Sequence, residues 1–399
     1  MINVTNPAKC CGCGNCALVC PNKCILINED ASGFLLPEVN KTSCINCGAC
    51  DRVCPVLNHK NEVDLKHTAY VAYSKDKQVR FNGSSGGMFG TIANLVLEEN
   101  ALGEAHVYGA AFDDQLQLKL TRAETKKELN GLYKSKYLQS NLNNQFPEIK
   151  ALLDDGKIVL FTATPCQVYA LKLFLKKDYE NLITVDFVCH GVPSQSLFDK
   201  CKGYVEKSKK IKIIDYQFRA KRKRGSTPHY CKYTYLKNGK KFSKIMLYTK
   251  DPFYLAFQKY ITMRDSCYEC QFSHSNRCSD ITIGDFHQVD EFVNGINRFE
   301  GVSLLITNTI KGEGIVNKIK DNLCLHQLDA STLIAQKSIL SGNGTVATSK
   351  RAQFITDLQN EDFGFVVKKH LNSKKEWKKN VYYALPRFIR ERIKKIMGV

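Results

Sequence analysis

Residues 10–21 read Cys10-Cys11-Gly12-Cys13-Gly14-Asn15-Cys16-Ala17-Leu18-Val19-Cys20-Pro21, and their cysteine spacing is C-x₂-C-x₂-C-x₃-C-P. The same spacing returns at residues 44–55, where the cysteines are Cys44, Cys47, Cys50 and Cys54 and the proline is Pro55. This doubled pattern is the signature of bacterial ferredoxin domains that hold two [4Fe–4S] clusters. It predicts a two-cluster electron-transfer domain over residues 1–60.

The spacing also predicts which cysteines share a cluster. The C-x₂-C-x₂-C loop supplies three thiolates to one cube, and the fourth cysteine lies one helical turn further on, where it reaches the other cube. One cluster is therefore assigned to Cys10, Cys13, Cys16 and Cys54, and the second to Cys44, Cys47, Cys50 and Cys20. Zinc is the alternative for C-x₂-C pairs, but two matched copies with matching prolines disfavour it.

Length, hydropathy and charge limit the possible functions of the residues after the cysteine-rich region. The chain has 399 residues, which leaves room for two further domains, and no run approaches the ~20 apolar residues that span a bilayer. No signal peptide precedes the cysteines, so we expect reduced thiols and a cytoplasmic protein. The net charge is +19, and residues 368–399 hold 11 Lys and Arg against two Glu. A short basic run adds more charge at Arg219, Lys221, Arg222, Lys223 and Arg224. Outside these two regions the charge is close to balanced, which argues against a nucleic-acid binder.

Residues 55–68 are polar and predict a linker, and the body begins with a short strand at Tyr70–Tyr73. A Gly/Ser loop follows at Asn82–Gly90 and leads into a predicted helix at Thr91–Glu99. Free amides and the dipole at a helix start favour an anion, so the loop is a candidate phosphate site. An ordinary turn is the alternative, because Gly/Ser loops are common.

Two apolar strands each lead to a cysteine and then a helix. Lys157–Phe161 ends near Cys166, and Leu182–Val188 ends at Cys189. Ligand sites in open α/β sheets gather at the carboxyl ends of strands, and strands alternating with helices indicate a partly parallel sheet. Residues 211–248 read instead as antiparallel strands with an Asn-Gly hairpin turn.

A third set of cysteines includes the pair Cys267 and Cys270. Together with Cys166 and Cys189 this pair could hold a third [4Fe–4S] cluster, and Cys278 competes for one of those places. Half of a zinc site and buried structural cysteines are the alternatives. Cys11 and Cys24 fall outside the ferredoxin spacing and are interpreted as packing residues.

With these residues in place, the chain resembles the β-subunit family of the coenzyme F(420)-reducing hydrogenases and dehydrogenases, to which the plant 7-hydroxymethyl chlorophyll a reductase is related. Seven stretches in one order carry the resemblance over roughly residues 68–290. They are Gly83–Met88, Ser135–Tyr137, Thr164–Gln167, Cys189–Ser194, Phe218–Arg219 with Lys221, Cys267–Cys270 and Asp280–Phe286. A fused two-cluster ferredoxin domain also occurs in that family.

The resemblance implies a flavoprotein that binds FAD beside the third cluster. It assigns Ser84, Ser85, Gly86 and Gly87 to the FAD phosphates, and Ser135, Lys136 and Tyr137 to the surroundings of the flavin. Arg219 and Lys221 would reach the FAD or the substrate, and Lys136 or Arg219 would stabilise negative charge on reduced flavin. It also makes Cys166, Cys189, Cys267 and Cys270 the expected ligands of the third cluster.

The chain departs from many bacterial relatives at its last motif, where Gly284-Asp285-Phe286 is followed by His287 and Gln288. His287 is a candidate proton donor to a reduced product, with a hydrogen-bonded rim residue as the alternative. The family does not guarantee the deazaflavin substrate, because many bacterial members are associated with surface-polysaccharide biosynthesis. The terminal substrate is therefore expected to be a small organic or sugar-linked molecule.

We therefore expect an α+β and α/β protein with a ferredoxin fold at 1–60, a mixed α/β flavin-binding body at 68–150 and 151–310, and a helical basic region at 311–399. Its expected activity is iron–sulfur flavoprotein oxidoreduction in either direction, with ferredoxin or another low-potential carrier as the partner. A pure electron-transfer subunit that serves a partner enzyme is the alternative. Residues 386–397 are amphipathic at helical spacing, which predicts either peripheral contact with the inner membrane face or packing on the protein itself.

Overall fold

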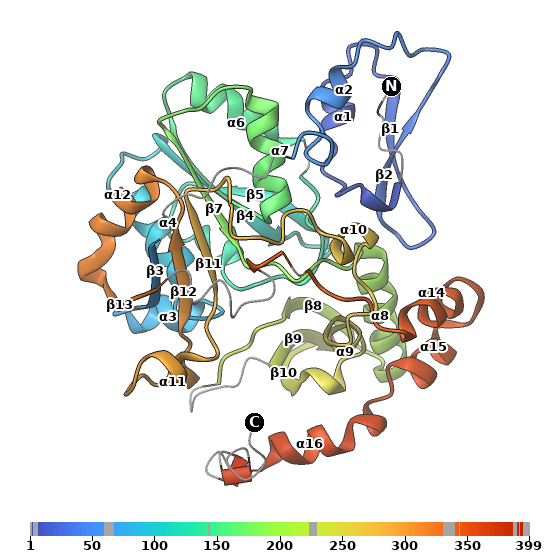
Figure 1. Ribbon diagram of the computed structural model, residues 1–399. Coiled ribbons are helices and arrows are strands. Elements are labelled where there is room, and N and C mark those ends of the chain that lie inside the picture. The colour runs from blue at the N-terminus through green and yellow to red at the C-terminus, as the bar shows by residue number, and fades with distance from the viewer. Residues whose placement is uncertain are drawn as a thin grey trace.

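The computed structural model describes residues 2, 7–59, 68–142, 144–222, 230–329, 340–342, 344–385, 389–390 and 392–393. A small N-terminal domain lies at one end of a large sheet covered by helices. A smaller sheet and the C-terminal helices lie on another side of it (Figure 1).

The N-terminal domain is built from two cysteine loops and one hairpin. Helices α1 (Asn15–Leu18) and α2 (Ala49–Arg52) follow the two loops, and strands β1 (Ile25–Glu29) and β2 (Leu35–Val39) pair antiparallel. Gly14 and Gly48 cap the two helices in the left-handed region, with φ of 76° and 68°. Glycine adopts this conformation at no steric cost, so the sequence turns sharply between the second and third cysteine of each loop.

The large sheet has the strand order β13-β3-β12-β11-β7-β6-β4-β5. Its strands are β3 (Thr68–Ser74), β4 (Ala105–Phe112), β5 (Leu118–Ala123), β6 (Ile158–Thr162), β7 (Leu182–Phe187), β11 (Ile281–Asp285), β12 (Ser303–Thr307) and β13 (Leu323–Leu328). The neighbours β11, β7, β6 and β4 are parallel, and the outer pairings are antiparallel. The predicted partly parallel sheet is confirmed, and the carboxyl ends of its parallel strands meet at one edge.

Helices cover both faces of this sheet because successive strand residues point to opposite sides. Val107 and Leu160 pack with α4 (Met88–Glu98) and α12 (Ile310–Ile319), whereas Tyr108 and Phe161 pack with α6 (Gln145–Asp154) and α7 (Pro165–Leu175). The short helices α3 (Lys77–Asn82) and α5 (Leu129–Leu132) flank α4 along the chain. The body is therefore a helix–sheet–helix sandwich.

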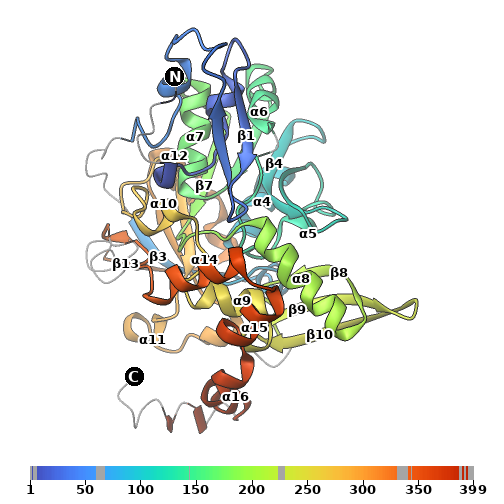
Figure 2. The same cartoon turned by 90° about the vertical axis from the view of Figure 1, so that its right-hand side faces the viewer.

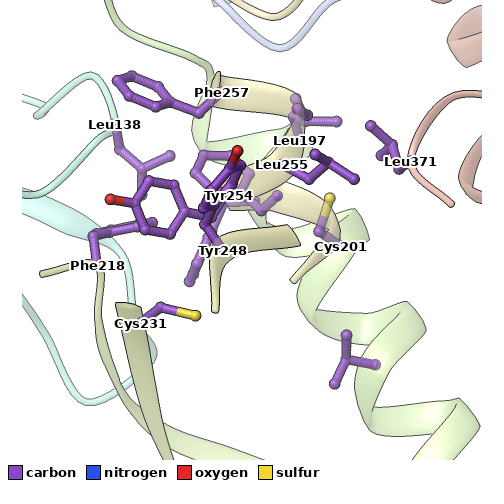
Figure 3. Packing of buried hydrophobic residues seen from close by; sticks show 14 of the residues in the cluster. Leu138, Leu197, Cys201, Phe218, Cys231, Tyr248, Tyr254, Leu255, Phe257 and Leu371 are labelled. Carbon is purple, nitrogen blue, oxygen red and sulfur yellow. The ribbon is translucent and has the colours of Figure 1, made fainter. Parts of the chain in front are cut away.

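The smaller sheet has the order β10-β9-β8 and packs on helices. Its elements are β8 (Lys212–Gln217), β9 (Tyr230–Lys237), β10 (Lys240–Leu247), α8 (Gln195–Lys209), α9 (Pro252–Gln258), α14 (Lys350–Asn360) and α15 (Phe363–His370). Cys201, Cys231 and Tyr254 belong to its buried core, part of which is drawn in Figure 3. In Figure 2 the β9–β10 hairpin projects from the body, and α16 (Trp377–Ala384) lies beyond α15.

Two expectations differ from the structure, and two others lie mostly outside the described residues. Helix α7 begins at Pro165, so Cys166 lies in its first turn rather than in a loop before it. The region 311–399 is not wholly helical, because Leu323–Leu328 pairs with β3 as an edge strand of the large sheet. Most of the predicted linker, at residues 60–67, and most of the amphipathic segment 386–397 lie outside the described residues. None of the helices in the described ranges is long and apolar enough to cross a membrane.

The N-terminal domain contacts the body through polar groups. The Asn15 side-chain amide donates to the Ala170 carbonyl at 2.8 Å, and the Tyr169 hydroxyl donates to the Asn58 carbonyl at 2.9 Å. The Ser194 hydroxyl donates to the Ser32 carbonyl at 2.7 Å. These bonds hold the domain against α7 and the start of α8, as Figure 1 shows for α7.

Candidate functional site

Two cavities in the N-terminal domain are lined by the two predicted sets of cysteines. The first, of about 410 Å³ including its mouth, is lined by Cys10, Cys13, Cys16 and Cys54. The second, of about 300 Å³ including its mouth, is lined by Cys20, Cys44, Cys47 and Cys50. The fold thus brings the fourth cysteine of each run to the cavity of the other run, which is the grouping that the spacing predicts.

The chemistry of these donor sets fits iron–sulfur clusters. Burial and the neighbouring Cys10 and Cys54 raise the pKa of Cys16 to about 12. Ionised thiolates in such a set therefore need positive charge, which cluster irons supply. Among the described residues, no three His, Cys, Asp or Glu side chains converge on one metal ion. A cubane makes a different demand, because each of its four irons takes its own thiolate.

A third cavity, of about 800 Å³ including its mouth, lies between the N-terminal domain and the body. Its lining includes Cys166, Cys189, Cys267 and Cys270, together with Cys11. Cys166 follows β6 and Cys189 follows β7, and these strands are parallel neighbours. Their cysteines therefore reach the same edge of the sheet. Cys267 comes from the short helix α10 (Asp265–Tyr268), and Cys270 follows it.

The loops around the third cavity are fixed by local bonds. The Gln167 side-chain oxygen accepts from the backbone and hydroxyl of Thr164 at 3.4 and 3.0 Å, which caps α7. The Thr164 hydroxyl also lies 3.2 Å from the Cys166 sulfur. Gly191 has a φ of 106°, and a Cβ placed there would lie 2.9 Å from that of Cys267. A side chain at position 191 would therefore push the two cysteine loops apart.

The four cysteines influence each other's charge, as a shared site requires. Burial, followed by Cys166, raises the pKa of Cys189 to about 12 and that of Cys270 to about 11. A hydrogen bond with Cys11, followed by burial, raises the pKa of Cys166 well above its usual range. Four thiols of this kind have the donor chemistry of a third [4Fe–4S] cluster.

The other cysteines separate into distinct places. Cys278, the competitor for the third set, lines a different cavity with His59 and Asp186. Cys201 and Cys231 are buried in the core of the smaller sheet, and Cys24 lies 3.4 Å from Cys20 between sulfurs. Cys11 lines both the first and the third cavity. The sequence predicted Cys11 only as a packing residue. Its position between two cysteine sets depends on how the N-terminal domain packs on the body, which the spacing does not show.

The Gly/Ser loop precedes α4 and is tied to two other segments. The Ser84 hydroxyl accepts from the Ser135 amide at 2.6 Å and lies 3.0 Å from the Ser135 hydroxyl. The Ser303 hydroxyl accepts from the Gly86 amide at 2.9 Å. Gly87 has a φ of 91° and is the residue before the first turn of α4. The loop therefore brings the predicted motifs at 84–87 and 135–137 together.

Arg219 joins this loop to the end of β11. Its guanidinium makes a two-pronged ion pair with Asp285 at 2.5 and 3.1 Å, and also donates to the Tyr137 hydroxyl at 3.0 Å and the Ser84 carbonyl at 3.2 Å. Burial opposes ionisation of Asp285, but Arg219 and then His287 hold its pKa well below the usual range. The His287 ring nitrogen lies 3.8 Å from the Asp285 carboxylate, and its side chain is mostly exposed.

Three lysines add positive charge around the same loop. The Lys221 ammonium donates to the Arg80 and Ser85 carbonyls at 2.5 and 2.6 Å. Burial, and then Lys134, lowers the pKa of Lys221 to about 7, and the same two causes lower that of Lys136 to about 7. Burial, Lys232 and Arg219 lower the pKa of Lys134 to about 8. Cations that disfavour each other's charge in this way fit an anionic ligand.

Lys136 is held differently from its neighbours in the motif. Its ammonium donates to the Gly131 and Tyr133 carbonyls, both at 2.8 Å. Sequence reasoning did not single out Lys134, which lies two residues before Lys136, or Gln139 and Arg264, which line the third cavity. Lys134 and Gln139 flank the Ser135–Tyr137 motif, and this closeness in sequence is the one feature that could have identified them. For Arg264 the sequence offered only its position three residues before Cys267.

Comparison with known proteins places this geometry in a family. Residues 156–331 match the C-terminal part of the coenzyme F(420) hydrogenase/dehydrogenase beta subunit, and residues 69–146 match the N-terminal part of the same protein. The chain belongs to this family. Residues 9–58 match a 4Fe-4S dicluster domain, so this family member carries an iron–sulfur electron-transfer domain at its N-terminus.

One solved structure adds a distant similarity. It is a xenon-derivatised F(420)-reducing [NiFe] hydrogenase complex from Methanosarcina barkeri, and one of its chains shares 17% identity with this protein. The alignment covers 65% of this chain and 81% of that chain, with a TM-score of 0.42. The search of curated proteins gave no match.

Proposed function

We propose that this protein is an iron–sulfur flavoprotein oxidoreductase that passes electrons between ferredoxin-type clusters and FAD and so reduces or oxidises an organic substrate. The observation that carries the proposal is the course of residues 135–140. Ser135 bonds to Ser84 in the Gly/Ser loop that precedes α4, whereas Gln139 and Ser140 line the third cavity. Because four residues span at most about 14 Å, the loop site and the third cavity are near neighbours.

The cysteines are assigned to three clusters in this proposal. Cys10, Cys13, Cys16 and Cys54 hold one, Cys20, Cys44, Cys47 and Cys50 hold the second, and Cys166, Cys189, Cys267 and Cys270 hold the third. The support is that each set lines its own cavity. When bound, the clusters supply single-electron transfer, and the flavin exchanges one or two electrons with the substrate.

The residues of the body bind and orient the flavin nucleotide. Ser84, Ser85, Gly86 and Gly87, at the start of α4, are proposed to take its phosphates, because a helix start and nearby cations favour an anion. Lys221 and Lys134 balance the charge of the phosphates. Ser135, Lys136 and Tyr137 would lie near the flavin, and Arg219 would stabilise negative charge on it.

Asp285 and His287 are proposed to act at the substrate side. Asp285 keeps Arg219 charged and oriented through the two-pronged ion pair. His287 lies at the exposed rim beside Asp285, where it can deliver a proton from solvent to a reduced product. We propose that the substrate is a small organic or sugar-linked molecule, with surface-polysaccharide biosynthesis as its setting.

The metal and flavin content of the whole protein tests the proposal. After anaerobic reconstitution we expect about 12 Fe per chain, four for each of three cubanes, and one flavin. A protein without flavin would refute the flavoenzyme, and eight Fe with flavin would remove only the third cluster. A Cys267→Ser, Cys270→Ser variant should lose about four Fe and keep the ferredoxin clusters.

The second candidate function is an electron-transfer subunit whose substrate is converted on a partner protein. It is favoured by the family, which is named for hydrogenase and dehydrogenase beta subunits. Turnover of a reducible substrate by the isolated chain, with a low-potential donor such as reduced ferredoxin, supports the first function. Flavin reduction without turnover until a partner enzyme is added supports the second.

A further inference from the structure

Arg264 is a buried cation that bridges two cysteine loops. Its backbone amide donates to the Val192 carbonyl, and its carbonyl accepts from the Cys267 amide, both at 2.9 Å. These bonds fix the backbone of Arg264 against the loops that carry Cys189 and Cys267. Its side chain extends from there to the N-terminal domain, and only 3% of the residue is exposed.

Each nitrogen of the guanidinium donates to a neutral oxygen. Nε donates to the Cys10 carbonyl at 2.6 Å, Nη2 to the Leu35 carbonyl at 2.7 Å, and Nη1 to the Gln139 side-chain oxygen at 3.0 Å. Gln139 in turn donates to the Cys11 carbonyl at 3.0 Å. Arg264 and Gln139 thus hold two successive carbonyls of the first cysteine loop.

No acidic side chain balances this charge in the part of the chain that the structure describes. The ion pairs found there include Arg219 with Asp285 and Arg277 with Asp186, but none with Arg264. A buried charge without a counter-charge is costly. Arg264 lines the third cavity and contacts the loop of the first, and thiolate-bound clusters are anionic. Clusters held by the first and third sets of cysteines would therefore supply the counter-charge of the guanidinium.

We propose that Arg264 is a positioning residue that holds the Cys10 loop against the third cavity and supplies the positive charge shared by the two sites. The inference rests on the proposed cluster ligands but not on the flavin. The contacts of Arg264 also set the order of the two cysteine sets in the N-terminal domain. The first set is the nearer one to the body, and the second set, whose Cys47 is exposed, would be the nearer one to an external electron carrier.

Substitutions at Arg264 separate charge from position. Arg264→Gln removes the charge, and Arg264→Lys keeps the charge but loses the forked geometry. Gln139→Leu keeps the charge of Arg264 but removes both the acceptor of its Nη1 and the bond to the Cys11 carbonyl. Arg351→Gln is the matched control. Arg351 pairs with Asp265 of α10 and donates to the Ile261 carbonyl at 3.1 Å, and among the described residues none of its hydrogen bonds reaches the N-terminal domain.

The full-length, anaerobically reconstituted variants are compared by iron content, by the midpoint potential of the ferredoxin clusters and by the magnetic interaction between reduced clusters in EPR spectra. Positive charge favours the reduced, more negative cluster. Arg264→Gln should therefore make reduction about tenfold less favourable at equal iron content, which is about 59 mV for one electron. Arg264→Lys should keep the potential but weaken the magnetic interaction. Arg351→Gln should match the wild type in both.

An Arg264→Gln protein with full iron, unchanged potential and unchanged spectrum would overturn the proposal. If that variant does not load iron, Gln139→Leu decides: a weaker magnetic interaction at unchanged potential supports the clamp, and an unchanged spectrum rejects it. A wild-type protein without flavin would refute the flavoenzyme alone, because the potential of the ferredoxin clusters is measured without flavin.

Discussion

At the scale of single residues, the pairing of Arg219 with Asp285 connects the end of the smaller sheet to β11 across 66 positions of the chain. Arg219 is 7% exposed and Asp285 is 28% exposed at the side chain. Removing one partner of a buried pair leaves an unbalanced charge, and this loss costs several kcal/mol. The pair therefore fixes the segment on which the proposed flavin site depends.

We predict that Asp285→Asn lowers the free energy of unfolding by about 3 kcal/mol, measured from denaturant midpoints under anaerobic conditions. The folded-state pKa of Asp285 is depressed, so the stabilisation is present above the unfolded pKa and is lost as the pH falls. The difference between variant and wild type should therefore shrink in acid. Asp290→Asn is the control, because its pair with Arg298 is exposed and worth under about 1 kcal/mol. Equal losses in both variants would contradict the prediction.

The lysines around the Ser84–Gly87 loop predict proton uptake on ligand binding. Lys136 and Lys221 have pKa values of about 7 and Lys134 of about 8, so all three lose protons as the pH rises from 7 to 9. Anionic phosphates raise these pKa values. Binding of FAD to the flavin-depleted protein should therefore take up protons and weaken as the pH rises.

Calorimetry in buffers of different ionisation enthalpy measures this uptake. Lys221→Met should reduce the number of protons taken up, whereas Lys240→Met, on the exposed β9–β10 hairpin, should leave it unchanged. Binding with no dependence on the buffer would show that the lysines do not face the phosphates.

The residue scale also shows where sequence reasoning succeeds. The eight ferredoxin cysteines follow from spacing, because short loops and single helical turns fix where each sulfur points. Arg264 does not follow from any pattern. Its acceptor Cys10 is 254 positions away. The sequence near a C-x₂-C pair does not reveal which arginine will contact another domain, because that contact depends on how the two domains pack.

At the scale of elements, helix α7 determines where Cys166 lies. The sequence predicted the strand before it and a helix after Cys166, but Pro165 opens the first turn and places Cys166 inside the helix. Proline is favoured at the first helical position, where its missing amide is not needed. Strand β13 was missed because Leu323–Leu328 is a short edge strand whose only strand partner in the described sheet is β3, and the whole region 311–399 was interpreted as helical.

We predict that Thr164→Ala destabilises the start of α7 by about 1 kcal/mol and makes the iron of the third cluster more labile. The reason is that Thr164 bonds Gln167 and lies beside the Cys166 sulfur. Iron release to a chelator, measured over time, should show about four Fe leaving faster while eight leave at the wild-type rate.

Thr309→Ala provides the matched control for this effect. Thr309 caps α12 by accepting from the Gly312 amide at 3.1 Å, so its loss should cost a similar stability of about 1 kcal/mol. Its helix does not line any of the three cysteine cavities in the described structure. Faster iron release from Thr309→Ala as well would indicate a general loss of stability rather than an effect of the α7 cap.

At the scale of the whole molecule, positive charge is concentrated at one end of the chain. Residues 368–399 hold 11 Lys and Arg against two Glu. Within this region α16 exposes Trp377 and Val381, which are four residues apart and 60% and 52% exposed. An exposed tryptophan beside many cations suits the interface of an anionic membrane, and α16 lies at the far end of the molecule in Figure 1.

We predict that the full-length protein sediments with anionic vesicles and that deletion of residues 386–399 reduces this binding more than tenfold. The deleted segment holds five Lys and Arg against one Glu, and each cation near an anionic surface contributes about 1 kcal/mol. Binding should fall with added salt, because screening weakens it. Trp377→Ser, Val381→Ser should weaken binding without changing its salt dependence, since these side chains contribute apolar area. Neutral vesicles are the control, and equal sedimentation of the full-length and truncated proteins with anionic vesicles would assign the C-terminal segment to packing on the protein instead.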